Sequence, residues 1–138
     1  MQVLVAAGVI IKDGGVLLSQ RKRGTHLAGA WEFPGGKVEP GEDPREALAR
    51  ELNEELGVDA TVGDPIEVTF HRYPGKDVLL LFFEAALKPG SAEPRALDVA
   101  AVRWAAREDL IDEQFPPADV AVLAKVRARL DQGRSLPR

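Results

Sequence analysis

The stretch from Gly35 to Val58, GGKVEPGEDPREALARELNEELGV, limits what this chain can fold into more than any other segment. Asp43 followed by Pro44 is typical of a helix N-terminus, and Gly57 is typical of the residue at which a helix ends. The sequence therefore predicts a helix over residues 44–56 that follows directly on a glycine loop.

Two faces of this predicted helix differ in character. At about 100° per residue, three leucines form one apolar stripe: Leu48, Leu52 and Leu56. Three glutamates fall within an arc of about 100° on another face: Glu51, Glu54 and Glu55. Because Glu51 and Glu55 are like charges at i, i+4, they repel each other unless a positive group lies nearby. The alternative is a solvated acidic face on which Arg50 offsets its neighbours.

The glycine loop favours a metal site over a solvated face. Gly35 and Gly36 allow a tight backbone path that can direct carbonyl oxygens at a hard cation. Mg²⁺ prefers oxygen ligands and is usually bound together with a phosphate group. The loop and the acidic helix face therefore predict a magnesium site.

The spacing of these residues resembles the Nudix box at every fixed position. The match consists of Gly36, Glu42, Arg50-Glu51-Leu52, Glu54-Glu55 and Gly57-Val58. The resemblance implies hydrolysis of a nucleoside diphosphate linked to another group, with Mg²⁺ or Mn²⁺ bound by Glu51, Glu54, Glu55 and the Gly35 carbonyl. It implies that Glu54 or Glu51 is the general base and that Arg50 orients the glutamates. Coupled carboxylates share protons and metals, so the sequence leaves base and ligand unassigned.

Composition indicates one ordinary globular domain. The chain has 138 residues, 45% apolar and 29% charged, and we expect a single domain over residues 1–132 with a frayed tail over 133–138. Proteins that bind duplex nucleic acid usually have a basic surface, and a net charge of −4 does not indicate one. The expected partner is therefore a small nucleotide. The apolar run 3–11 is too short to span a membrane, and nothing suggests secretion, so we expect a cytoplasmic protein. The oligomeric state is not readable.

Strands and helices alternate along the chain in a pattern typical of a mixed sheet. The predicted strands are 3–11, 16–20, 31–33, 60–62, 65–72, 78–87 and 99–104. A short helical turn is predicted at 108–110 and a last helix at 118–130. We therefore expect an α/β sandwich in which a mixed sheet lies between helices, which agrees with the fold that the Nudix box implies.

Residues around the glycine loop supply further candidates. Arg21 or Arg23, in the only basic cluster ahead of the loop, could bind a substrate phosphate, although a solvated loop is the alternative. His26 could line the nucleotide site or lie on the surface. Glu32 and Lys37 flank the loop and could support the metal site or be exposed charges.

Outside the box the chain resembles the MutT branch of the family, which converts 8-oxo-dGTP to its monophosphate and pyrophosphate. Residues 31–37 match the pattern L/W-E-F-P-G-G-K, and residues 115–119 match F-P-P-A-N except that Asp119 replaces the asparagine. In MutT that asparagine reads the oxidised purine, whereas CTP-type pyrophosphohydrolases carry an aspartate there. Asp119 could therefore contact a purine or a cytosine, or it could cap the last helix. If Asp119 is only a cap, Lys76 is the next candidate for reading the base.

The resemblance also suggests a mechanism and leaves other functions open. It implies that a metal-oriented water attacks the β-phosphorus of a nucleoside triphosphate, which cleanses the nucleotide pool and so protects DNA. Asp98, six residues before Trp104, stands where MutT-like enzymes place an acidic group that completes the metal site. Two alternatives remain: a module that senses nucleotides without cleaving them, and an enzyme for sugar or dinucleotide linkages.

Overall fold

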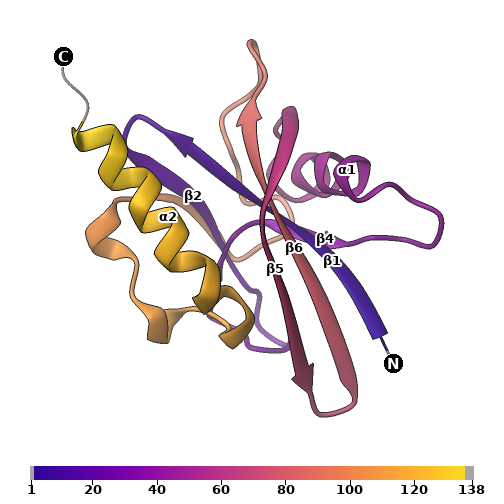
Figure 1. Cartoon of the computed structure of the whole chain (residues 1–138). Coiled ribbons are helices and arrows are strands. Elements are labelled where there is room, and N and C mark those ends of the chain that lie inside the picture. Colours follow the sequence, from indigo (N-terminus) through magenta and orange to yellow (C-terminus); the bar gives the residue numbers. More distant parts are fainter. Residues whose placement is uncertain (1, 136–138) are drawn as a thin grey trace.

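The computed structural model describes residues 2–135, which form a mixed sheet with one helix on each side (Figure 1). The strands are β1 (Gln2–Lys12), β2 (Gly15–Gln20), β3 (Trp31–Glu32), β4 (Gly35–Lys37), β5 (Ala60–Tyr73), β6 (Lys76–Leu87) and β7 (Ala101–Ala105). The helices are α1 (Pro44–Leu56) and α2 (Pro117–Ser135), with short 3₁₀ turns at Arg107–Asp109 and Asp112–Gln114. No helix within residues 2–135 is long and apolar enough to cross a membrane.

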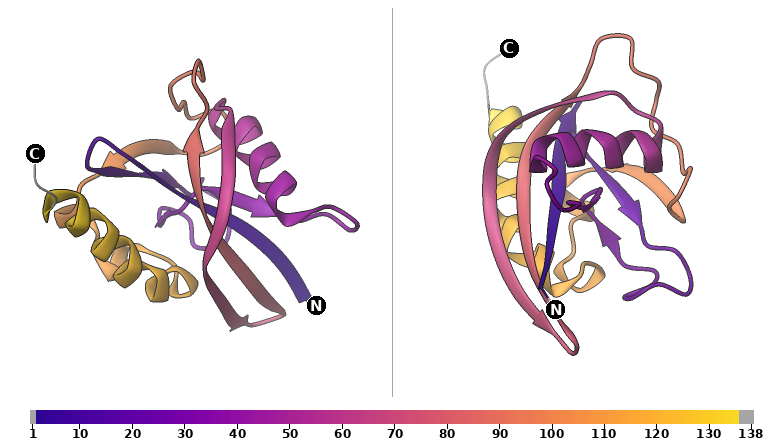
Figure 2. Two further views of the ribbon diagram at one scale, coloured as in Figure 1. Left: turned by 45° about the horizontal axis from the view of Figure 1, so that its top comes forward. Right: turned by 90° about the vertical axis from the view of Figure 1, so that its right-hand side faces the viewer.

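Strand β1 organises the sheet because it pairs with three other strands. It runs parallel to β6 and antiparallel to β2 and β4, and β5 forms the outer strand beyond β6. Alternate β1 residues face opposite helices: Ala6 and Ile10 pack in the core under α1, whereas Ala7 and Val9 pack in the core under α2. Figure 2 shows the two helices on opposite sides of the sheet. The predicted α/β sandwich, with a first strand buried on both faces, is confirmed.

Helix α1 has the bounds that the sequence predicts. Asp43 accepts the backbone N–H of Arg45 at 2.7 Å, and Gly57 ends the helix in the left-handed region at φ 71°. The predicted leucine stripe, Leu48, Leu52 and Leu56, is fully buried. The adjoining acidic face of α1 is therefore fixed in orientation by apolar packing.

The segment predicted as a glycine loop is a strand. Gly35–Lys37 pairs antiparallel with Val5–Ala7 of β1. A Cβ atom on Gly35 would lie only 2.0 Å from the carbonyl oxygen of Ala6, so this close pairing requires glycine. The acidic face of α1 consequently lies beside a sheet edge.

Several other boundaries differ from the prediction, including that of β6, which begins at Lys76 and not at residue 78. β5 is continuous where a break at Gly63-Asp64 was predicted, because register shifts between Val62 and Glu67 absorb the irregular residues. β7 begins two residues later than predicted. α2 extends to Ser135 beyond the predicted end at residue 130, and residues 136–138 of the predicted frayed tail lie outside the described residues.

Candidate functional site

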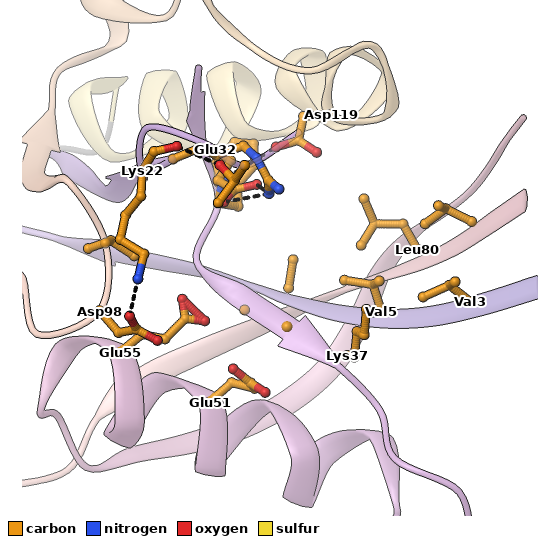
Figure 3. A pocket seen from close by; sticks show the side chains of 18 of the residues that line it. Val3, Val5, Lys22, Glu32, Lys37, Glu51, Glu55, Leu80, Asp98 and Asp119 are labelled. Carbon is orange, nitrogen blue, oxygen red and sulfur yellow. Dashed lines mark hydrogen bonds and ion pairs between the residues drawn. The ribbon is translucent and has the colours of Figure 1, made fainter. Parts of the chain in front are cut away.

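A cavity of about 410 Å³ lies where β4, α1 and the start of α2 come together (Figure 3). Its apolar floor consists of paired residues of β1 and β6 on one face of the sheet, namely Val3 with Val78 and Val5 with Leu80. Acidic side chains of α1 line one end, and Asp119 of α2 lines another part of the wall. The cavity can therefore hold a molecule with an apolar part and a charged part.

Glu51 and Glu55 project from α1 into the acidic end of the cavity, and Asp98 joins them from the loop before β7 (Figure 3). A Cβ atom on Gly36 would lie 2.3 Å from the carboxyl carbon of Glu51, so the glycine leaves the space that this carboxylate occupies. Burial raises the pKa of Glu55 to about 9, with further contributions from the Glu51, Glu32 and Asp98 carboxylates. This end of the cavity therefore gathers carboxyl groups without enough positive charge to keep all of them ionised.

Arg50 ties the glutamates of the box together. Its guanidinium binds both carboxylate oxygens of Glu42 at 2.8 and 2.9 Å, and it also contacts Glu51 at 3.0 Å and Glu54 at 3.2 Å. Its hydrogen bond to Glu42 is the main reason that the pKa of that carboxyl falls to about 2. The contacts agree with the prediction that Arg50 orients the glutamates.

The acidic end fits a hard divalent cation by the chemistry of its donors. Within residues 2–135, no three histidine, cysteine, aspartate or glutamate side chains lie close enough together to bind one metal ion in their present positions. Glu51, Glu55 and Asp98 nevertheless offer carboxylate oxygens beside the glycine strand. Burial raises the pKa of Glu55, and the neighbouring acids Glu51, Glu32 and Asp98 raise it further. Glu54 lies at the rim, where its side chain is 56% exposed, and it does not line the cavity.

Asp119 is the buried acid of the cavity. Only 4% of the residue is exposed, and Oδ2 accepts the backbone N–H of Phe33 at 3.4 Å. Burial raises the pKa of Asp119 well above its usual range, and the Glu32 carboxylate adds to the rise. Because α2 begins at Pro117, Asp119 is the third helical residue, so the alternative that it is the N-cap is wrong.

Glu32 and Arg21 form an ion pair on the cavity wall, with Nη1 and Oε1 3.1 Å apart. Burial raises the pKa of Glu32, while the charge and hydrogen bond of Arg21 oppose the rise. Arg21 also donates from Nε to the carbonyl of His26, which fixes the guanidinium against its own loop. Arg21 is therefore held beside Glu32 and is partly neutralised by it.

The remaining predicted residues divide into two groups. Lys37 and Lys76 line the cavity, whereas Arg23 and His26 are exposed and do not. The His26 ring packs edge-on against Tyr73, with ring centroids 4.8 Å apart. The fold thus brings most of the predicted residues to one cavity, but Arg23 and His26, like Glu54 and Arg50, lie outside its lining.

Lys22 is a cavity residue that sequence reasoning missed. It lines the cavity and forms an ion pair with Asp98. The basic cluster at residues 21–23 was a signal, but which members face inward depends on a turn that the Lys22 carbonyl closes with the N–H of Thr25. Periodicity does not predict the side-chain directions in such a turn.

Comparisons with known proteins agree with this geometry. The model of the NUDIX domain matches residues 2–126. The chain is 39% identical over 119 residues to the CTP pyrophosphohydrolase of Escherichia coli K12, and the alignment covers 86% of this chain and 87% of the relative. It is 36% identical over 125 residues to the 8-oxo-dGTP diphosphatase of Haemophilus influenzae, covering 90% of each.

A solved structure described as the MutT NUDIX hydrolase from Burkholderia pseudomallei superimposes with a TM-score of 0.81 at 30% identity. The match covers 91% of this chain and 98% of that one. The family match spans most of the chain, and the fold and the box agree with it. The chain therefore belongs to the NUDIX domain family and is a Nudix hydrolase.

Proposed function

We propose that this enzyme hydrolyses oxidised or modified nucleoside triphosphates to the monophosphate and pyrophosphate in a Mg²⁺-dependent reaction, with 8-oxo-dGTP as the leading substrate. The observation that carries this proposal is the division of one cavity into an acidic end, an apolar floor and a separate buried acid. A nucleobase fits the apolar floor beside Asp119, while the triphosphate extends toward Glu51 and Glu55. Removal of a damaged nucleotide in this way would protect DNA.

The acidic end supplies the chemistry of the reaction. Glu51, Glu54 and Glu55, with the Gly35 carbonyl and Asp98, would hold Mg²⁺, and the bound ion would supply neutralisation of phosphate charge and a lower pKa of bound water. Water attacks the β-phosphorus, the bond to the α–β bridging oxygen breaks, and Glu54 or Glu51 takes the proton.

Cationic side chains on the cavity wall bind the phosphates. Arg21 is the phosphate ligand predicted from the sequence that lines the cavity, and Lys37 and Lys76 are further cations in the same lining. Of these, Arg21 already contacts Glu32, so a phosphate reaches only the part of its guanidinium that Glu32 leaves free. Arg23 and His26 lie outside the cavity and take part only if their loop rearranges.

The raised pKa of Asp119 determines how it reads a base. An ionised carboxylate only accepts hydrogen bonds, whereas a protonated carboxyl group both donates and accepts, as an asparagine amide does. Because burial favours the protonated form, Asp119 can present to an oxidised purine the same pair of functions that an asparagine would. This supports 8-oxo-dGTP as the leading substrate.

A cytosine nucleotide is the second candidate, and one observation favours it. The CTP pyrophosphohydrolase of Escherichia coli is 39% identical to this chain over nearly its full length. The exocyclic amine of cytosine donates hydrogen bonds, which suits the accepting oxygens of Asp119.

A panel of canonical, oxidised and methylated nucleoside triphosphates, assayed for pyrophosphate release with Mg²⁺, tests the proposal and ranks the bases. Glu54→Gln should lower kcat about 10²-fold or more on every substrate, on the scale of losing an acid–base group. Glu46→Gln, an exposed change in the first turn of the same helix, is the matched control and should retain activity. Full activity of Glu54→Gln would remove Glu54 from the mechanism.

Asp119→Asn separates base reading from catalysis. The variant should retain kcat/KM on 8-oxo-dGTP, because its amide also donates and accepts, as the protonated carboxyl group does. It should change kcat/KM by about 5-fold to 150-fold on a base that needs an accepting carboxylate, which is the range for leaving a buried partner unsatisfied and which changes the ranking of the bases. Equal loss on every nucleotide, or no loss on any, would place base reading at another residue, with Lys76 tested next.

A further inference from the structure

Lys22 and Asp98 form an ion pair across the mouth of the acidic end. Lys22 lies in the turn after β2 and Asp98 in the loop before β7, and Nζ of Lys22 donates to Oδ1 of Asp98. Figure 3 shows the lysine reaching down to Asp98 beside Glu55. Both side chains line the cavity, although they are 48% and 63% exposed.

The backbones that carry this pair are anchored. The N–H groups of Leu97 and Asp98 donate to the carbonyl of Glu55 at 3.0 and 3.1 Å, which docks the Asp98 loop on the end of α1. The carbonyl of Lys22 accepts the hydroxyl of Thr25 at 2.6 Å. Because both main chains are held, the two side chains can change partners without a movement of either loop.

One acid beside the pair lacks a positively charged partner, and a metal–nucleotide complex would provide one. Arg50 forms an ion pair with Glu51, and Lys22 forms one with Asp98. Glu55 forms no ion pair with a lysine or arginine of the described residues. A divalent cation would supply positive charge to Asp98 and Glu55 together, and the phosphates would offer Lys22 a replacement anion. An exposed ion pair is weak, so its rupture opposes the exchange only slightly.

We propose that Lys22 is a placeholder for the metal–nucleotide complex: it neutralises Asp98 in the free enzyme and transfers to a substrate phosphate when Asp98 binds the cation. The proposal rests on the proposed function, because it assumes a phosphorylated substrate and a metal at the acidic end. It predicts that Lys22 weakens metal binding to the free enzyme and strengthens binding of the nucleotide.

Lys22→Met tests the exchange because the two affinities should change in opposite directions. Electron paramagnetic resonance of free Mn²⁺ measures metal binding without any turnover, and steady-state kinetics with a nucleoside triphosphate measures KM. Metal affinity of the variant should rise roughly 3-fold to 10-fold, because a competing charge is removed. KM should rise about 10-fold, because a charge-assisted contact to phosphate is lost.

Lys12→Met is the matched control. Lys12 is 48% exposed, as Lys22 is, and pairs with Glu93 at 3.7 Å away from this cavity, so its removal should change neither affinity. In an Asp98→Asn background, Lys22→Met should no longer tighten Mn²⁺ binding, since the competition has already been removed.

Three results would overturn the exchange: Mn²⁺ affinity within two-fold of the wild type, Mn²⁺ and nucleotide affinities that fall together, or equal tightening in the Asp98→Asn background. An unchanged Mn²⁺ affinity would mean that Lys22 at most contacts a phosphate. Affinities that fall together would mean that the Lys22–Asp98 ion pair only stabilises the structure of the site. If the wild-type enzyme cleaves no nucleoside triphosphate, the proposed function fails, while the Mn²⁺ measurement still reports on the competition between Lys22 and the metal.

Discussion

At the scale of single residues, the site depends on acids that are buried to different depths. Asp119 is almost fully buried, whereas Glu54 is more than half exposed and bound by Arg50. Depth determines protonation, because removing a carboxylate from water favours its neutral form. One cavity can therefore combine carboxyl groups that can bind a metal with a buried carboxyl group that donates a hydrogen bond.

The burial of Asp119 predicts a pH dependence of stability. A carboxyl group with a raised pKa in the folded state contributes stability that is complete below its unfolded pKa and is lost as pH rises through the folded pKa. Asp119→Asn removes this dependence, so the Tm of the variant relative to the wild type should increase from about pH 4 upward. Calorimetry of both proteins without metal checks this, and a Tm difference that is constant with pH would contradict the raised pKa.

At the scale of elements, strand β4 joins the sheet to the acidic face of α1. Its first glycine contacts the β1 backbone and its second contacts the Glu51 carboxylate. Adjacent residues of one strand point to opposite sides, so two neighbouring glycines meet different requirements. One requirement concerns the fold and the other concerns the site.

Two alanine substitutions should separate these requirements. Gly35→Ala places a Cβ atom 2.0 Å from backbone and should destabilise the protein by about 1–3 kcal/mol or more, a loss visible in Tm. Gly36→Ala places one against the mobile end of Glu51 and should leave Tm nearly unchanged, while displacement of the carboxylate lowers kcat by about 10²-fold.

Gly8→Ala is the control, because its Cβ would meet Leu48 at an ordinary 3.5 Å. That variant should retain both stability and activity. Equal effects of the Gly35 and Gly36 substitutions on Tm would show that β4 plays one structural role only.

At the scale of the whole molecule, the two helices pack against opposite faces of the sheet and both contribute to the cavity. Glu51 and Glu55 come from α1 and Asp119 comes from α2, so the acids that line the cavity come from helices on both sides of the sheet. A ligand that binds the acidic end should consequently stabilise the complete fold.

Divalent cations should therefore raise Tm. Binding to the native state but not to the unfolded chain stabilises the fold by about 2.7 kcal/mol at a ligand concentration of 100 Kd. Differential scanning fluorimetry with MgCl₂ or MnCl₂ measures the shift against NaCl at equal ionic strength. The shift should shrink in Glu51→Gln, and an undiminished shift would place the ion elsewhere.

Much of the fold follows from local pattern. The continuous apolar run at the N-terminus predicted a strand buried on both faces, and the leucine spacing with Asp43 and Gly57 predicted α1 at both ends. These features are readable because periodicity and capping act within a few residues. The i, i+4 spacing of Arg50 and Glu54 likewise predicted their contact, because residues one turn apart on a helix are neighbours.

Only the tertiary structure decided the rest of the site. Whether Lys22, Arg21 or Arg23 faces the cavity depends on one loop turn, and whether Asp119 caps α2 or lies buried beside Phe33 depends on where that helix meets the sheet. Residues 35–37, predicted as a glycine loop, form a strand because they pair with β1. Local sequence thus determined which elements form, whereas burial and side-chain direction arose from contacts between residues far apart in the chain, which no short-range pattern encodes.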